Sequence, residues 1–141
     1  MPHTSGLEGH SDGDVLTHAI ADALIGAAGA GDLGQWFSDT DEQYRGAESV
    51  QLLRQVAVSL RERGWRVGNV DASVVAQSPR LSQYLEAMRM RLAEALQVEP
   101  DSVNVKATSP EHVGSLGREA AIAAFATALI EQQPAAPAES D

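Results

Sequence analysis

The sequence predicts a small α/β domain of the layered α+β type, in which helices cover one side of a small sheet. Apolar residues recur at helical spacing in four segments of the chain, and two shorter segments have the alternating or continuous apolar pattern of strands. A chain of 141 residues can bury one moderate core. Because two strands make only a marginal sheet, we expect further strands from this chain or from a partner.

Four helices are predicted. They are expected from Asp14 to the glycine-rich run 26–31, from Ser49 to Gly64, over about residues 82–98 and over about residues 118–132. Ser49 is the expected N-cap of the second helix, and Arg61 and Arg63 suit its negative end. The last segment is rich in alanine and carries Phe125 and Leu129 among its apolar positions. These patterns place four amphipathic faces on the predicted sheet.

Two strands are predicted between these helices. The first covers Trp65 to Gln77, with a bulge at Gly68, and Ser78-Pro79 ends it. The second is Val103 to Ala107, after a turn at Pro100-Asp101. Residues 32–41 are predicted as a polar loop, and the Pro/Ala/Glu-rich residues 134–141 as a disordered tail. The sequence therefore predicts a single domain over residues 1–133.

Composition excludes several classes of function. The formal net charge of -10 argues against nucleic acid as a partner, since phosphate backbones are bound by basic surfaces. The absence of cysteine excludes disulfides and thiolate metal sites. No apolar run is long enough to span a membrane, and the N-terminus lacks the features of a secretory signal. We therefore expect a cytoplasmic protein.

Residues 10–18 concentrate more potential chemistry than any other stretch. They read His-Ser-Asp-Gly-Asp-Val-Leu-Thr-His, with two imidazoles and two carboxylates where a loop is predicted to become a helix. Imidazole is a common metal ligand, and free N–H groups at a helix start can hold phosphate. Ser-Asp-Gly-Asp is also ordinary capping chemistry. Spacing alone leaves both interpretations open.

Several motifs in register resolve this ambiguity by resemblance. The run from His10 to Val15 with His18 resembles the signature of the 2-C-methyl-D-erythritol 2,4-cyclodiphosphate synthase family. The similarity continues in order through motifs at 31–41, 68–71, 76–80, 103–108 and 114–118. It covers about Gly6 to Glu131. The resemblance implies a homotrimer in which the sheets of three subunits meet.

The resemblance also implies a reaction of isoprenoid synthesis, a pathway for which a plastid is the alternative location to the cytoplasm. In it, the 2-phosphate of a cytidine-diphosphate-linked methylerythritol attacks the distal phosphorus of its own diphosphate, and CMP leaves. By the family pattern, His18 is a ligand of zinc or manganese, and Glu111 holds magnesium. His10 and Ser109 are the implied catalytic groups, and His10 with Ser11 binds the phosphates.

The remaining implied site residues bind parts of the substrate. The resemblance implies that the methylerythritol part is bound by Asp32, Leu33, Gly34, Phe37, Ser38, Asp39, Thr40 and Asp41. It implies that the cytidine part is bound by Ala76, Gln77, Ser78, Pro79, Arg80, Leu81, Ser82 and Thr108. Further implied substrate contacts are Pro110, Glu111, Ser115 and Arg118, the last near the trimer axis.

The sequence departs from the family pattern in one important respect. The family begins with a strand that ends in Asp-x-His and supplies two further ligands of the His18 metal, and no such pair precedes Gly6 here. A catalytic zinc normally has three protein ligands. We therefore expect low activity from this chain. The alternatives are a truncated or metal-deficient homologue that binds cytidine nucleotide, and an interaction module.

Overall fold

The computed structural model describes residues 2–37, 47–75, 84–108 and 123–133, with side chains from Gly13 in the first helix and from Ser49 in the third. The described helices are α1 (Pro2–Ala27), α2 (Leu33–Trp36), α3 (Ala47–Glu62) and α4 (Leu85–Leu96), with a 3-10 turn η3 (Pro100–Ser102). The strands are β1 (Trp65–Val75), β2 (Val103–Thr108) and β3 (Ala123–Gln132). None of these helices is long and apolar enough to cross a membrane.

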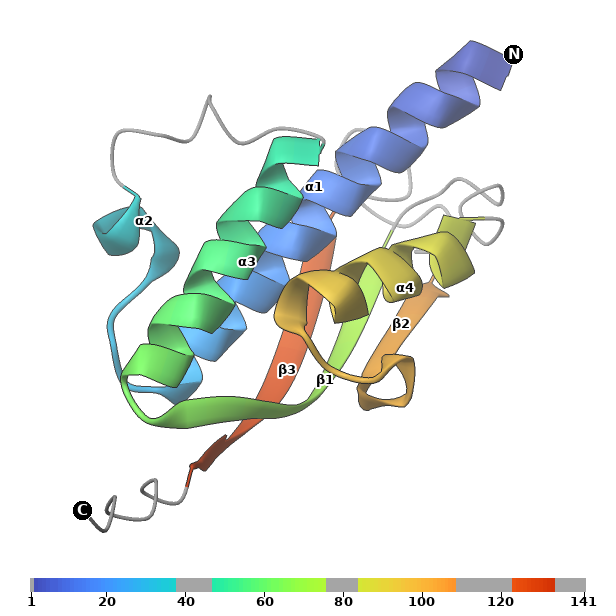
Figure 1. Cartoon of the computed structure of the whole chain (residues 1–141). Helices are drawn as coiled ribbons and strands as arrows, with labels where there is room; N and C mark the ends of the chain where they lie inside the picture. Colours follow the sequence, from blue (N-terminus) through green and yellow to red (C-terminus); the bar gives the residue numbers. More distant parts are fainter. Residues whose placement is uncertain (1, 38–46, 76–83, 109–122, 134–141) are drawn as a thin grey trace, which may run out of the picture.

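The three strands form one mixed sheet in the order β2-β1-β3. Central β1 runs parallel to β2, pairing Val70 with Val103, and antiparallel to β3, pairing Asp71 with Thr127. Helices α1, α3 and α4 lie on one side of this sheet (Figure 1). The predicted α/β class, with helices on one face of a small sheet, is therefore confirmed.

The core lies between the helices and one face of the sheet. Its fully buried side chains include Leu16 and Leu24 of α1, Leu53 and Leu60 of α3, Leu96 of α4 and Val70 and Val74 of β1. Strand side chains alternate between faces, so the neighbouring residues point to the other, uncovered side. On that side Phe125 and Leu129 of β3 are 64% and 58% exposed. We call this side the open face of the sheet.

Strand β3 corrects the predicted helix over 118–132. Residues 123–132 are a strand, and 118–122 lie outside the described residues. Alanine favours helices, but here Ala124, Ala126 and Ala128 alternate with outward-facing residues and pack against the core. Small side chains on this face leave room for α1, so tertiary packing outweighs the helix propensity of alanine.

This packing gives the first prediction. We expect Ala126→Leu to lower the free energy of unfolding by about 1–3 kcal/mol, because extra methyl groups on a packed face force neighbours from their preferred rotamers. Urea unfolding monitored by circular dichroism measures this change in the free energy of unfolding. Ala87→Leu on the exposed side of α4 is the matched control and should shift stability by no more than about 0.5 kcal/mol. Equal effects of the two variants would contradict the tight packing of β3.

Two predicted helix starts are wrong. Helix α1 begins at Pro2 rather than Asp14, and Pro2 suits a first turn because its missing N–H would have no partner there. Gly13 lies inside the helix, where its carbonyl accepts a hydrogen bond from the Thr17 hydroxyl at 2.6 Å. Helix α3 begins at Ala47, so Ser49 is not its cap. The Ser49 hydroxyl instead donates to Asp14 at 2.9 Å and joins α3 to α1.

The other predicted boundaries agree closely with the structure. Gly64 follows α3 with a φ of 91°, a conformation that glycine adopts without strain. The register of β1 and β3 shifts between Val67 and Asn69, which confirms the predicted bulge at Gly68. A Cβ on Gly68 would lie 3.1 Å from the Leu129 carbonyl, so a side chain would crowd β3. Helix α4 and strand β2 also match their predictions. At the ends that the structure describes, each begins and ends within three residues of its predicted bounds.

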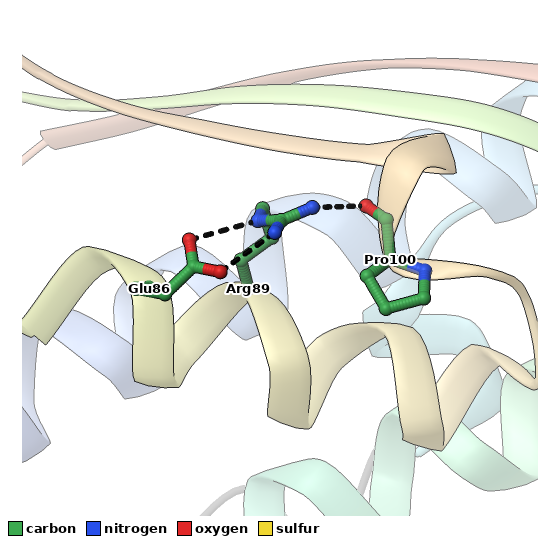
Figure 2. Close-up of polar contacts among 3 residues, drawn as sticks. All are labelled: Glu86, Arg89 and Pro100. Carbon is green, nitrogen blue, oxygen red and sulfur yellow. Dashed lines mark hydrogen bonds and ion pairs between the residues drawn. The ribbon is translucent and has the colours of Figure 1, made fainter.

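Arg89 links α4 to the turn before β2. Its guanidinium donates to both Glu86 carboxylate oxygens, at 3.1 and 2.6 Å, and to the Pro100 carbonyl at 2.6 Å (Figure 2). The hydrogen bond from Arg89 holds the pKa of Glu86 below its ordinary value. The same pair raises the pKa of Arg89. Helix α4 is thereby tied to η3 at one end of the sheet.

A pH dependence follows from this pair. Because the native pKa of Glu86 is lowered, its ionised form stabilises the fold at neutral pH, and this contribution is lost as the pH falls below about 4, the ordinary range of a carboxyl group. We expect Glu86→Gln to melt below the wild type at pH 7 and to approach it near pH 3. Glu94→Gln, an exposed glutamate of the same helix, is the control. A melting difference that stays constant with pH would contradict this linkage.

Candidate functional site

Helix α1 carries the first group of the candidate site. Asp14, His18 and Asp22 are spaced four residues apart and therefore share one side of the helix. His18 is half-buried beside the fully buried Leu16 and Ile20 of the same helix. Its Nε2 atom is buried and finds no hydrogen-bond partner among the residues that the structure describes. A buried polar atom in this state destabilises a fold unless a ligand satisfies it.

The chemistry of His18 fits one position of a metal site. An imidazole nitrogen that no described residue hydrogen-bonds can serve as a ligand of zinc or manganese. In the described ranges, no group of three or more His, Cys, Asp or Glu side chains converges around a point where an ion could lie. His18 is therefore a fitting ligand, and the described residues around it do not by themselves complete a ligand set. The expectation that Asp-x-His ligands are missing stays a prediction.

The segment after α1 brings the second group of the candidate site. The predicted polar loop contains the short helix α2 at its start, and Asp32 is its N-cap. Asp32 Oδ1 accepts a hydrogen bond from the Gln35 amide at 2.9 Å. Asp22 Oδ1 accepts one from the Leu33 amide at 2.9 Å, which links α1 to α2. The helix that carries His18 thus also fixes the backbone beside Asp32.

Two aromatic side chains anchor α2 from its other end. The Trp36 indole N–H donates to the Ala30 carbonyl at 3.0 Å, and the Arg63 guanidinium carbon lies 4.6 Å from the centre of the Trp36 ring. Phe37 follows, its ring centre 6.4 Å from that of Trp36. Leu33, Trp36 and Phe37 are partly buried against the core. Asp32 is therefore exposed on a segment whose other side packs against the core.

The open face of the sheet carries an ion pair that the sequence motifs did not reveal. Lys106 of β2 donates to Asp71 of β1 at 2.9 Å, and the Asn104 amide donates to the same carboxylate at 3.0 Å. These hydrogen bonds, Asn104 first and Lys106 second, hold the pKa of Asp71 below its ordinary value. Thr108, expected near the cytidine, ends β2 and is exposed.

Several predicted site residues have no described side chain. His10 and Ser11 lie in α1, but the structure describes only their backbone. Outside the described residues lie Ser38, Asp39, Thr40, Asp41, Ala76, Gln77, Ser78, Pro79, Arg80, Leu81, Ser82, Ser109, Pro110, Glu111, Ser115 and Arg118. Sequence reasoning missed Asp22, Trp36 and Arg63. The four-residue spacing from His18 could have indicated Asp22, whereas the two others meet only through the fold.

Comparison with known proteins places the chain in a family. The YgbB family matches residues 1–131, and the chain belongs to that family. Its relatives include proteins named 2-C-methyl-D-erythritol 2,4-cyclodiphosphate synthase. The one from Pseudomonas putida strain W619 is 58% identical over 130 residues, which are 92% of this chain and 83% of that protein. The one from Synechococcus elongatus is 52% identical, over 92% of this chain and 81% of that protein.

Solved structures agree with the family. The bifunctional IspDF of Campylobacter jejuni superposes with a TM-score of 0.78 at 38% identity, over 84% of this chain and 32% of that chain. A complex of Plasmodium falciparum IspF with CDP has a TM-score of 0.74 at 27% identity, over 85% of this chain and 72% of that chain. The resemblance inferred from the sequence motifs is thereby confirmed.

Proposed function

We propose that this chain acts as a 2-C-methyl-D-erythritol 2,4-cyclodiphosphate synthase. The identity of 58% over 130 residues to a protein of that name carries the proposal. The Nε2 atom of His18 supports it independently, because it is buried with no hydrogen-bond partner among the described residues and such a nitrogen suits an enzyme that binds an ion. The substrate would be 4-diphosphocytidyl-2-C-methyl-D-erythritol 2-phosphate.

The reaction is an intramolecular phosphoryl transfer. An oxygen of the 2-phosphate forms a bond to the distal phosphorus of the diphosphate, and the bond from that phosphorus to the bridging oxygen breaks. The electron pair leaves on the bridging oxygen, which becomes a phosphate oxygen of CMP. Because nucleophile and electrophile belong to one molecule, catalysis depends on folding the substrate into position and on neutralising its charge.

The chain's residues would divide this task by region. Asp32 and the segment that follows it would bind the hydroxyls of the methylerythritol part, and residues 76–82 with Thr108 would bind cytidine. His10 and Ser11 would donate to phosphate oxygens, and Ser109 would add a hydroxyl donor. A net charge of -10 makes such local donors necessary for a substrate rich in phosphate.

Two ions would complete the site. His18 would hold zinc or manganese, and Glu111 would hold magnesium, whose preference is for oxygen ligands. When bound, such ions would neutralise negative charge on the phosphates. The protein's own contribution would be to place the His18 imidazole on α1, the same helix that fixes the backbone beside Asp32 through Asp22.

We also propose a homotrimer in the cytoplasm, with the open faces of three sheets turned toward a common axis. The exposed Phe125 and Leu129 support this arrangement, since water-exposed apolar side chains of this size on a sheet are stabilised by burial. Arg118 would lie near the axis. Sedimentation equilibrium tests it: a mass three times the chain mass of 14.9 kDa is expected, and a monomer would contradict it.

The experiment on function is a direct assay. Purified protein is incubated with the diphosphocytidyl substrate, Zn²⁺ and Mg²⁺, and CMP and the cyclic diphosphate are separated by chromatography and detected by ³¹P NMR. Equal amounts of both products are expected. CDP binding without CMP release would instead identify a nucleotide-binding homologue. A failure to bind CDP at millimolar concentration would favour an interaction module.

A further inference from the structure

The four residues of α2 cannot hold their conformation alone. A helix of this length completes little more than one turn, and isolated helices become stable only at several times that length. Its amides at Trp36 and Phe37 donate to the carbonyls of Asp32 and Leu33 at 3.3 and 2.9 Å. These bonds persist only if contacts from the rest of the fold fix the segment.

Trp36 makes the contacts that join this segment to its surroundings at the C-terminal end. Its indole N–H reaches back to the Ala30 carbonyl and so closes the loop that contains Asp32. Arg63, at the end of α3, lies over the indole ring, with its guanidinium carbon 4.6 Å from the ring centre. A guanidinium at this distance from an indole ring is attracted by its negative face. Trp36 is therefore held between two elements of the chain.

The group that this arrangement positions is Asp32. Its Oδ1 is engaged by the Gln35 amide, while Oδ2 accepts no hydrogen bond from the described residues. The carboxylate is exposed, whereas Trp36 is half-buried against the core. Trp36 thus faces the fold and Asp32 faces solvent, so an effect of Trp36 on a ligand would pass through the backbone between them.

We propose that Trp36, clamped between the Ala30 carbonyl and the Arg63 guanidinium, is a positioning residue that holds Asp32 for the sugar-phosphate part of the substrate. The inference rests on the proposed function. It predicts a selective effect: loss of the clamp weakens recognition of the methylerythritol part and leaves recognition of cytidine unchanged. It also assigns the end of α3 a part in the site, through the contact of the Arg63 guanidinium with the Trp36 indole.

The test uses Trp36→Phe, which keeps an aromatic face for Arg63 and removes the indole donor, and Arg63→Met, which removes the cation. Trp65→Phe is the matched control at the other tryptophan of the chain. For each of the first two variants we expect KM for the diphosphocytidyl substrate to rise about fivefold, the effect of one net hydrogen bond or cation–π contact. The Kd for CMP should stay within about twofold of the wild type.

Hydrogen exchange supplies a readout that does not need turnover. The amides of Trp36 and Phe37 should exchange faster in both variants, while those inside α3 remain protected. Unchanged exchange and KM, or KM and the CMP Kd rising together, would overturn the inference. Faster exchange with unchanged KM would also overturn it, since the clamp would then be structural only. A wild-type protein without CMP release would refute the proposed function itself, a distinct result.

Discussion

Replacing His18 by leucine is expected to abolish CMP release, by at least about a thousandfold, while the metal-free protein melts at the same or a slightly higher temperature. The loss follows if His18 binds an ion that contributes several kcal/mol of charge stabilisation in the transition state. The stability follows from the structure, because Nε2 is buried with no hydrogen bond from the described part of the chain, and leucine removes that atom. Most substitutions of half-buried residues lower the melting temperature instead.

The ion can be tested apart from activity. Zn²⁺ at about a hundred times its Kd should stabilise the wild type by about 2.7 kcal/mol, since a ligand that binds only the folded state favours folding, and should leave His18→Leu unaffected. His3→Leu, the same substitution at a histidine outside the family motifs, is the control. If His18→Leu lowered the melting temperature and kept its activity, the histidine would be structural.

Asp32→Asn is expected to reduce kcat/KM about ten- to a hundredfold with no loss of stability. Asparagine caps a helix as well as aspartate, so the hydrogen bond to the Gln35 amide is kept. The negative charge is lost and one acceptor oxygen becomes an NH₂ donor, whereas hydrogen bonds from substrate hydroxyls to a charged acceptor contribute about 1.5–3 kcal/mol.

Asp32→Ala separates the two roles of this side chain. It removes both the carboxylate and the cap, so we expect a similar loss of kcat/KM together with a fall of about 1 kcal/mol in the free energy of unfolding. Kinetic assays and urea unfolding of both variants give the comparison. If Asp32→Asn had wild-type kinetics and only the alanine variant were impaired, Asp32 would act as a cap alone.

The sequence indicated those parts of the candidate site that depend on local spacing. His18 and Asp32 stand in motifs that a reader can find along the chain, and the structure connects them through Asp22 on α1. The sequence could not predict that Nε2 of His18 would be buried and unbonded by any residue that the structure describes, because that depends on how the helices pack. The meeting of Trp36 with Arg63 likewise requires α3 to lie beside α2.

The fold shows the same division. Gly64 and Gly68 were predicted as a helix end and a bulge because glycine tolerates these local geometries. Strand β3 was mistaken for a helix because alanine favours helices in isolation. Its true state is set by pairing with β1 and by the close approach of α1, neither of which lies near β3 in the sequence.

The contact of α1 with β3 also determines when the fold can be completed. The two elements are about a hundred residues apart, so a ribosome that adds about 5–20 residues per second delivers the strand roughly 5–20 s after the helix. Until then the part of α1 that packs against β3, and the edge of β1 that pairs with it, lack that strand as a partner. Completion of the sheet is therefore the late event in biogenesis, and chaperones that shield apolar surface would act in that interval.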